Sequence, residues 1–317
     1  MTARARQLLV QAALAAALAL AAWYFVSNTA ANLEARRIAS GFAFLWREAG
    51  FEIGETAGLA YSAADSYLRA LAIGLANTFR IALIGIVFAT ALGALLGLAR
   101  LSPNWLLAKL AGAYVEVIRN VPLLVQLFFW YALISENLPG PAEALNPLPG
   151  VFLSNRGIFF PLPGDSPVLS GFNFAGGATL SPEFAALLVG LVTYTAAFIG
   201  EIVRAGILSV DRGQIEAAYS LGLARRAAMR FVVLPQALRL IVPPMTSQYL
   251  NLTKNSSLAV AIGYPDLVSI ANTTMNQTGQ AIEGIAIIMG VYLTISLSIS
   301  AFMNWYNRRV ALRGMLR

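Results

Sequence analysis

The chain of 317 residues is 58% hydrophobic and only 12% charged, and its formal net charge is +7. Soluble domains carry about 25% charged residues, so this composition excludes an ordinary water-soluble fold and predicts a helical membrane protein. The sequence contains neither cysteine nor histidine, which excludes disulfides, thiol nucleophiles and metal sites built from these ligands. In a membrane protein the positive charge indicates basic loops on one side of the bilayer rather than nucleic-acid binding.

Six segments are predicted to cross the membrane, because each approaches the ~20 residues that span ~30 Å of hydrocarbon as a helix. Two of the six carry charged and amide side chains, which lipid does not tolerate, so we expect these two to face the interior of a helix bundle. The uncharged segments are 8–26, 81–99, 184–200 and 285–303, and the two polar segments are 111–134 and 240–262.

Six crossings place both termini on one side, and the lysine and arginine residues predict which side this is. Cytoplasmic loops are enriched in these residues. One face holds 14 of the 22 and the opposite face holds five, so we expect both termini in the cytoplasm. The first set is Arg4, Arg6, Arg100, Lys109, Arg204, Arg212, Arg225, Arg226, Arg230, Arg239, Arg308, Arg309, Arg313 and Arg317; the second is Arg36, Arg37, Arg47, Arg69 and Arg156.

The predicted organisation is a cytoplasmic N-terminus (1–7), a first membrane helix (8–26), a periplasmic segment (27–70), a membrane domain (71–305) and a cytoplasmic tail (306–317). The first helix also resembles a signal peptide. Its apolar run of 19 residues exceeds the usual length of about 7–15, and the aromatic residues at 23–25 suit a membrane interface. These features favour an uncleaved anchor.

Residues 136–183 contain eight of the fourteen prolines and seven glycines. Proline fixes φ and removes a hydrogen-bond donor, so the segment is predicted to be a long periplasmic loop with neither helix nor central strand. Loops of this length are more often functional than idle, although a simple hydrophilic connector remains the alternative.

The loop 209–237 carries a pair of short helices by its local signals. Asp211 suits a helix start, Gly222 suits a helix end, and Arg225 begins a second, basic helix that Pro235 is predicted to end. Two short helices that meet at a glycine form a compact cytoplasmic knob. Such a knob either lies on lipid headgroups or fits a groove on a partner.

This loop also resembles the EAA motif of ABC importer permeases. The residues that match are Glu216, Ala217, Ala218, Gly222, Leu234 and Pro235, and Val232 stands where the family usually has isoleucine. The resemblance implies that the loop forms the coupling helix that docks in a cleft of a cytoplasmic ATPase. No Gly-x-x-x-x-Gly-Lys-Ser/Thr motif occurs in this chain, so any use of ATP is expected from another polypeptide.

Segments 74–79, 119–126 and 254–258 resemble the polar-amino-acid permeases of the histidine/glutamine type. The extra first helix and the long loops resemble a longer variant that serves uptake of general L-amino acids, or of glutamate, glutamine, aspartate and asparagine, in Gram-negative bacteria. The resemblance implies an all-α membrane protein with a type-I ABC importer permease core of five helices plus one N-terminal helix. It also implies a bacterial inner-membrane location, a second permease subunit, an ATPase dimer and a periplasmic amino-acid-binding protein, with no cofactor bound by this chain.

Five polar residues are candidates for the substrate pathway: Arg119, Gln126, Lys254, Asn255 and Ser256. An arginine fork suits the carboxylate of an amino acid, and polar groups inside a span usually face a pathway or a partner. Two of the five have a structural alternative. Arg119 can pair with Glu116, and Lys254 can snorkel to the interface or bind carbonyls freed by Pro243 and Pro244.

Other polar and small residues in the spans favour structural roles. Glu201 and Arg204 are spaced to form a local ion pair, and Gly93 with Gly97 allows close approach of a second helix.

Two other classes of function compete with a permease. A stand-alone secondary carrier or channel needs intramembrane acids for ion coupling, and Glu116 and Glu201 are few for that purpose. An intramembrane hydrolase would use Lys254 with Ser256 or Ser257, but no oxyanion arrangement is evident in the sequence.

Overall fold

The structure, a computed structural model, describes residues 3–35 and 40–310, so that Arg36, Arg37, Arg313 and Arg317 lie outside the described residues. Ten α-helices occur within these ranges. They are α1 (Ala3–Ala35), α2 (Tyr67–Arg100), α3 (Trp105–Asn120), α4 (Leu123–Ser135), α5 (Pro182–Leu208), α6 (Arg212–Ser220), α7 (Arg225–Ala228), α8 (Leu234–Asn255), α9 (Leu267–Thr278) and α10 (Ala281–Val310).

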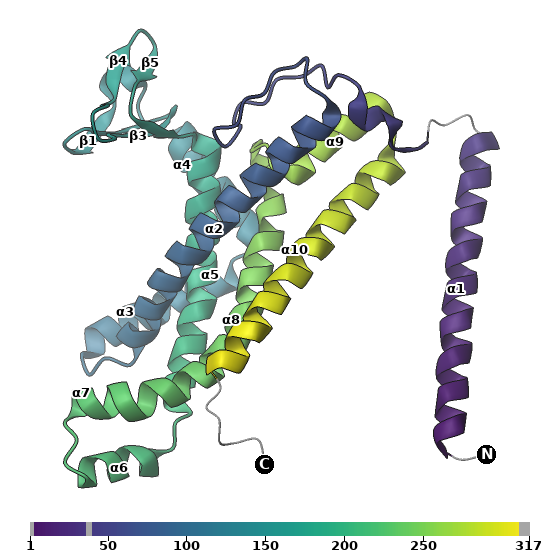
Figure 1. Ribbon diagram of the computed structural model, residues 1–317. Coiled ribbons are helices and arrows are strands. Elements are labelled where there is room, and N and C mark those ends of the chain that lie inside the picture. Colours follow the sequence, from purple (N-terminus) through teal and green to yellow (C-terminus); the bar gives the residue numbers. More distant parts are fainter. Residues whose placement is uncertain (1–2, 36–39, 311–317) are drawn as a thin grey trace.

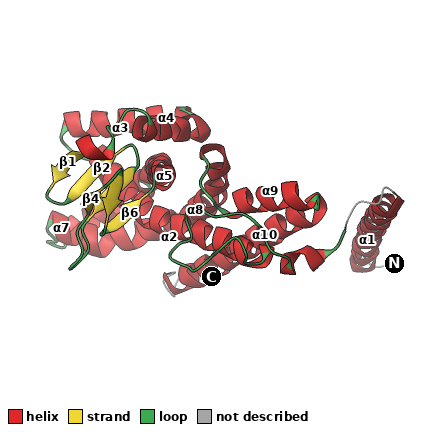
Figure 2. Ribbon diagram, turned by 90° about the horizontal axis from the view of Figure 1, so that it is seen from above, coloured by secondary structure: helices red, strands yellow, loops and turns green. Residues whose placement is uncertain are grey.

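Figure 1 shows α9 and the β-strands at one end of the molecule and α6 and α7 at the opposite end. We call these the outer end and the inner end, following the orientation that the sequence predicts. Helix α1 stands apart from the other helices in both views (Figures 1 and 2), and its described side chains are exposed. Helices α1, α2, α5 and α10 are long and apolar enough to cross a membrane, and they contain the four uncharged segments.

Three helices extend beyond the apolar runs that the sequence marks as membrane spans. Helix α1 continues to Ala35, so the predicted segment 27–70 begins inside it, and no glycine or proline interrupts residues 27–35. Helix α2 begins at Tyr67, after Ser66 caps it by accepting a hydrogen bond from the N–H of Arg69. Helix α10 reaches Val310, inside the predicted tail 306–317.

The predicted span 111–134 is not one straight helix. It divides into α3 and α4, which are bent by 105° at Val121 and Pro122. Proline has no N–H and pushes the residue before it out of the helical region, and Val121 accordingly has extended dihedral angles. The polar span 240–262 is also divided: α8 ends at Asn255 and a 3₁₀ turn, η4 (Ser256–Ile262), follows.

Residues 136–183 are not a loop without regular structure. A 3₁₀ turn, η2 (Pro141–Glu143), precedes four strands that form an antiparallel sheet in the order β1-β2-β3-β6, and β4 pairs with β5 in a hairpin. The sheet and the hairpin meet through stacking of Phe152 on Phe174, with ring centroids 4.5 Å apart. The strands are β1 (Leu145–Leu148), β2 (Val151–Ser154), β3 (Gly157–Phe160), β4 (Val168–Ser170), β5 (Asn173–Ala175) and β6 (Ala178–Leu180).

The prolines predicted an irregular loop for 136–183, and this was wrong because most of them lie between the strands rather than inside them. Pro147 is within β1, which is an edge strand, and an edge strand tolerates a residue without an N–H. The strands are only three or four residues long, so each fits between two turns.

Two hydrophobic cores hold the helices together. The larger core packs residues of α2, α4, α5 and α8. The smaller core lies at the outer end, where the segment before α2, including the 3₁₀ turn η1 (Phe42–Trp46), packs on α2 and α9. Its fully buried residues include Phe44, Ile73 and Leu267. The outer segment is therefore a folded part of the molecule.

Helices α2 and α5 approach closely at two glycines, as the sequence predicts. A Cβ atom on Gly97 would lie 2.7 Å from the carbonyl oxygen of Gly200 and 2.8 Å from Cβ of Val203. A Cβ on Gly93 would lie 2.5 Å from a methyl carbon of Ile199. Small residues at these positions let the backbones touch, which strengthens packing between membrane helices.

The substitution Gly97→Ala is expected to destabilise the protein by about 1–3 kcal/mol, because the added methyl group overpacks a contact that includes backbone atoms. Thermal unfolding in detergent measures the effect. The matched control is Gly290→Ala in α10, where no atom lies within 4 Å of the added Cβ. That change should stabilise the helix by about 0.5–1 kcal/mol. Equal melting temperatures for the two variants would contradict the close contact.

Asp266 caps α9 at the outer end and is fully buried. Its Oδ1 accepts a hydrogen bond from the N–H of Ser269 at 2.8 Å. Burial disfavours the charged form and raises the pKa of Asp266 from 3.8 to about 7. The folded state therefore binds a proton more tightly than the unfolded state, and stability falls as pH rises through the window between these two values.

The substitution Asp266→Asn is expected to raise the melting temperature at pH 8 and to leave it unchanged at acid pH. The amide oxygen keeps the cap, and the buried charge is removed, so the gain at pH 8 should be on the order of 1–3 kcal/mol. The matched control is Asp211→Asn, which changes an exposed N-cap and should give no gain at pH 8. A variant Asp266→Asn that melts below the parent at pH 8 would refute the explanation.

Candidate functional site

The loop between α5 and α8 forms a compact knob at the inner end of the molecule (Figure 1). Helix α6 begins after Asp211, whose carboxylate accepts a hydrogen bond from the N–H of Gly213 at 2.6 Å. Ala218 is buried, whereas Glu216 and Ala217 are exposed. The predicted helix start at Asp211 is confirmed, and Glu216 lies on the face that the rest of this chain leaves uncovered.

Helix α6 ends at a glycine turn. Gly222 has a φ of +80°, a left-handed conformation that side chains with a Cβ rarely adopt. The N–H of Gly222 donates to the carbonyl of Tyr219 at 2.9 Å, and the N–H of Leu223 donates to the carbonyl of Ala218 at 3.1 Å. This is the hydrogen-bond pattern of a Schellman cap, so the predicted helix stop at Gly222 is confirmed.

The prediction that the second helix ends at Pro235 is wrong. Helix α7, a π turn called η3 (Met229–Val233) and α8 follow one another without a loop. The proline ring normally collides with the carbonyl four residues earlier and removes one hydrogen bond. The π turn has a wider ring of hydrogen bonds and directly precedes Leu234 and Pro235, so it accommodates the proline and the helix continues.

The exposed surface of the knob combines apolar and basic side chains. Leu221 is 83% exposed and Phe231 is 66% exposed. The arginines at 225, 226 and 230 are also exposed. Solvent-facing apolar side chains next to cations suit either the groove of a partner protein or a lipid surface, so the two interpretations of the sequence remain compatible with this geometry.

The pathway candidates of the third span lie at the break between α3 and α4. Arg119 is exposed, and its guanidinium carbon lies 4.9 Å from the ring centroid of Phe198 in α5. It forms no ion pair with Glu116. Gln126 is buried, and its Nε2 donates to the carbonyls of Ile118 at 2.9 Å and Val121 at 3.0 Å. Gln126 therefore completes the broken backbone, a role that the sequence did not suggest.

The candidates of the fifth span differ in exposure. Lys254 is exposed, Asn255 is half-buried and Ser256 is fully buried, with its hydroxyl donating to the carbonyl of Thr253 at 2.8 Å. The hydroxyl of Ser257 donates to the carbonyl of Lys254. Within residues 40–310, the Lys254 ammonium contacts neither serine through a hydrogen bond, so the geometry of a Ser/Lys hydrolase is not formed. No side-chain hydrogen bond or ion pair joins the five pathway candidates to one another in that range.

Glu201 joins two helices at the inner end. Its carboxylate pairs with Arg204, Nη2 to Oε1 at 2.6 Å, as the spacing predicts. It also pairs with Arg100, the last residue of α2. The sequence could not predict this second contact, because Arg100 and Glu201 are far apart along the chain. The carboxylate therefore acts as a structural tie between α2 and α5.

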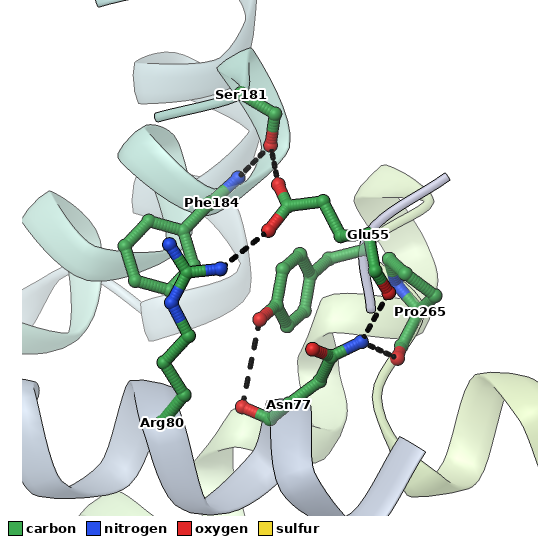
Figure 3. Close-up of polar contacts among 7 residues, drawn as sticks. Glu55, Asn77, Arg80, Ser181, Phe184 and Pro265 are labelled. Atoms are coloured by element: carbon green, nitrogen blue, oxygen red, sulfur yellow. Dashed lines mark hydrogen bonds and ion pairs between the residues drawn. The ribbon is translucent and has the colours of Figure 1, made fainter. Parts of the chain in front are cut away.

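A polar cluster at the outer end was not predicted from the sequence. Figure 3 shows that Glu55, from the segment before α2, points between α2 and α5. Its carboxylate accepts hydrogen bonds from Arg80 at 3.0 Å and from the hydroxyl of Ser181, the N-cap of α5. The Nδ2 of Asn77 donates to the carbonyls of Glu55 at 2.7 Å and Pro265 at 2.9 Å. Asn77 belongs to the segment 74–79, the only sequence signal that pointed toward this cluster.

Two opposing effects act on the carboxyl of Glu55. Burial raises the pKa of Glu55 above its usual value, and the neighbouring Glu183 adds to the rise. The hydrogen bond from Ser181 and the charge of Arg80 lower the pKa but do not cancel the rise. The Arg80 guanidinium also stacks on the ring of Phe184, at 4.3 Å from its centroid, so Arg80 is held on both sides.

Residues 89–312 match the family described as "Binding-protein-dependent transport system inner membrane component". The protein YhdX of Escherichia coli (strain K12) is 46% identical over 95% of this chain and 92% of its own length. AapQ of Rhizobium johnstonii is 42% identical over 92% of this chain and 88% of its own length, and its name is "General L-amino acid transport system permease protein".

Solved structures agree with the sequence match. A crystal structure of an amino acid ABC transporter with histidines has a TM-score of 0.57 and 28% identity, and the match covers 77% of this chain and 95% of that one. The MetNI methionine ABC transporter, at 21% identity and a TM-score of 0.52, shares the fold. The predicted fold class, an ABC importer permease core embedded in a membrane, is confirmed. The chain therefore belongs to the family of binding-protein-dependent transport system inner membrane components.

Proposed function

We propose that this chain is the permease subunit of an ATP-driven importer that moves polar or general L-amino acids from the periplasm to the cytoplasm. The family match carries the proposal. Two relatives that align with more than nine-tenths of this chain support the substrate class: AapQ, and the "Glutamate/glutamine/aspartate/asparagine transport system permease protein" BztB of Rhodobacter capsulatus, at 34% identity. Both termini of this chain then lie in the cytoplasm.

The inner knob is the coupling element of this proposal. Glu216 and Ala217 present an exposed helix face to the ATPase, and Gly222 sets the angle between α6 and α7. Ala218 packs α6 on the rest of the chain, and Leu234 and Pro235 continue the basic helix into α8. A surface with exposed apolar side chains and charged side chains at its rim is typical of a protein-binding site.

The importer contains partners beyond this chain. A dimer of ATPase subunits hydrolyses ATP, a second permease chain completes the pathway, and a periplasmic amino-acid-binding protein delivers the substrate to the outer end. The chain itself binds no cofactor in this scheme. Arg119, Lys254 and Asn255 remain candidates for the pathway, since their side chains have no hydrogen-bond partner within residues 40–310. Gln126 and Ser256 act through the backbone groups that they bind.

The substitution Glu216→Lys is expected to abolish co-purification of the ATPase and to stop uptake, while the permease still assembles in the membrane. The reason is that the Glu216 side chain is exposed and forms no hydrogen bond or ion pair with any residue that the structure describes, so a reversed charge acts on the partner. The matched control is Glu143→Lys, the same change of charge at an exposed position near the outer end. Retained ATPase binding in the Glu216→Lys variant would remove the coupling role.

Reconstitution tests the function as a whole. Vesicles that contain this chain, the second permease and the ATPase dimer should accumulate labelled glutamate, glutamine, aspartate, asparagine or leucine only with ATP inside and binding protein outside. The chain alone should move none of them, because it has no nucleotide site of its own. ATP-independent accumulation by the purified chain alone would instead establish the stand-alone carrier.

A further inference from the structure

The segment before α2 folds into a closed strap at the outer end. An isolated antiparallel bridge joins Glu48 to Ser66, and the N–H groups of Ala49 and Gly50 donate to the carbonyls of Asp65 at 2.8 Å and Ala63 at 2.9 Å. We call residues 48–66 the outer strap. Its base is fixed, since the buried Ala49 and Ile53 belong to the smaller core with α2 and α9.

The tip of the outer strap reaches a different part of the molecule. The hydrogen bond between Glu55 and Ser181 is the one polar contact that joins the strap to the start of α5 in the described part of the chain. Ser181 already caps α5, because its Oγ accepts from the N–H of Phe184 at 3.1 Å. Arg80 of α2 completes the contact through its ion pair with Glu55 at 3.0 Å (Figure 3).

The contact is polar and borders open space. A cavity of about 460 Å³ lies beside it, between the strap, the start of α5 and the start of α9. Glu55, Ser181 and Glu183 line this cavity together with Pro265 and Thr273. The strap tip and α5 can therefore separate without exposing the apolar cores, whereas the strap base cannot leave α2 and α9 without doing so.

We propose that Glu55, Arg80 and Ser181 form a latch that holds the tip of the outer strap against the start of α5, and that each transport cycle opens and recloses it. The inference rests on the proposed function. Helix α2 belongs to both hydrophobic cores, so the cores stay joined, and the strap tip is the part that the hydrogen bond between Glu55 and Ser181 fastens to α5. Glu55 is then a positioning residue: it touches no substrate and sets how the strap and α5 lie relative to each other.

Cross-linking tests the latch in the complete importer. The chain has no cysteine, so Glu55→Cys with Ser181→Cys introduces a unique pair of thiols. A short, reducible thiol cross-linker should stop amino-acid uptake, and cleavage of the linker should restore it in the same preparation. The matched control, Glu52→Cys with Ala63→Cys, links the strap to itself, because the Glu52 carboxylate accepts from the N–H of Ala63 at 3.3 Å.

The control link should leave uptake unchanged. Full uptake with the 55–181 link in place would overturn the latch, and so would an equal loss with both links, because the effect would then belong to the strap as a whole.

A second measurement separates failure of the latch from failure of the proposed function, because it needs no uptake. A single Glu183→Cys thiol, which lines the same cavity and leaves the Ser181 hydroxyl in place, is labelled with a water-soluble maleimide in the otherwise unchanged chain. Adding Glu55→Gln, which keeps the shape and removes the charge that pairs with Arg80, should raise the labelling rate several-fold. Adding Glu52→Gln, on the same strap, should not. Equal rates in the two variants would overturn the latch, whatever solute the complex carries.

Discussion

Each backbone N–H and C=O group inside a bilayer must find its partner within the protein, because hydrocarbon offers none. Helices α2, α5 and α10 meet this requirement along unbroken lengths. At the break between α3 and α4 a side chain meets it instead, since the amide of Gln126 donates to two carbonyls at the end of α3. Ser256 does the same where α8 passes into η4. Several polar residues of the weaker spans are therefore explained by the backbone before any substrate is considered.

The pairing of α2 with α5 organises the rest of the bundle. In the inner half of the pair, Gly93 and Gly97 bring the two backbones into contact. At the two ends the contact becomes ionic: Glu201 joins Arg100 to α5 at the inner end, and Glu55 joins Arg80 to the cap of α5 at the outer end. The two charge pairs lie at different levels of this pair of helices, and each gives a half-buried carboxylate a cationic partner, as the cost of an unpaired charge in hydrocarbon requires.

Local signals in the sequence predicted local structure well. Asp211 and Gly222 start and stop α6, because caps and left-handed turns depend on neighbours in the chain. The prediction that a helix ends at Pro235 was wrong, because the π turn before it accommodates the proline ring. No residue pattern in the sequence indicates a π turn. The Glu55 cluster could not be predicted either. Its members come from positions 55, 80 and 181, and only the folded chain shows which of several acids and arginines become partners.

The continuity of α7, the π turn and α8 has a mechanical consequence. No loop lies between the inner knob and η4, so one continuous helical segment joins the two. Tilt or rotation at one end can pass along this segment to the other, and Pro243 and Pro244 inside α8 are the places where it can bend. The far end leads through Gly263 directly into Tyr264 and Pro265, whose neighbours hold the outer strap. One helical segment thus connects the inner end of the molecule with its outer end.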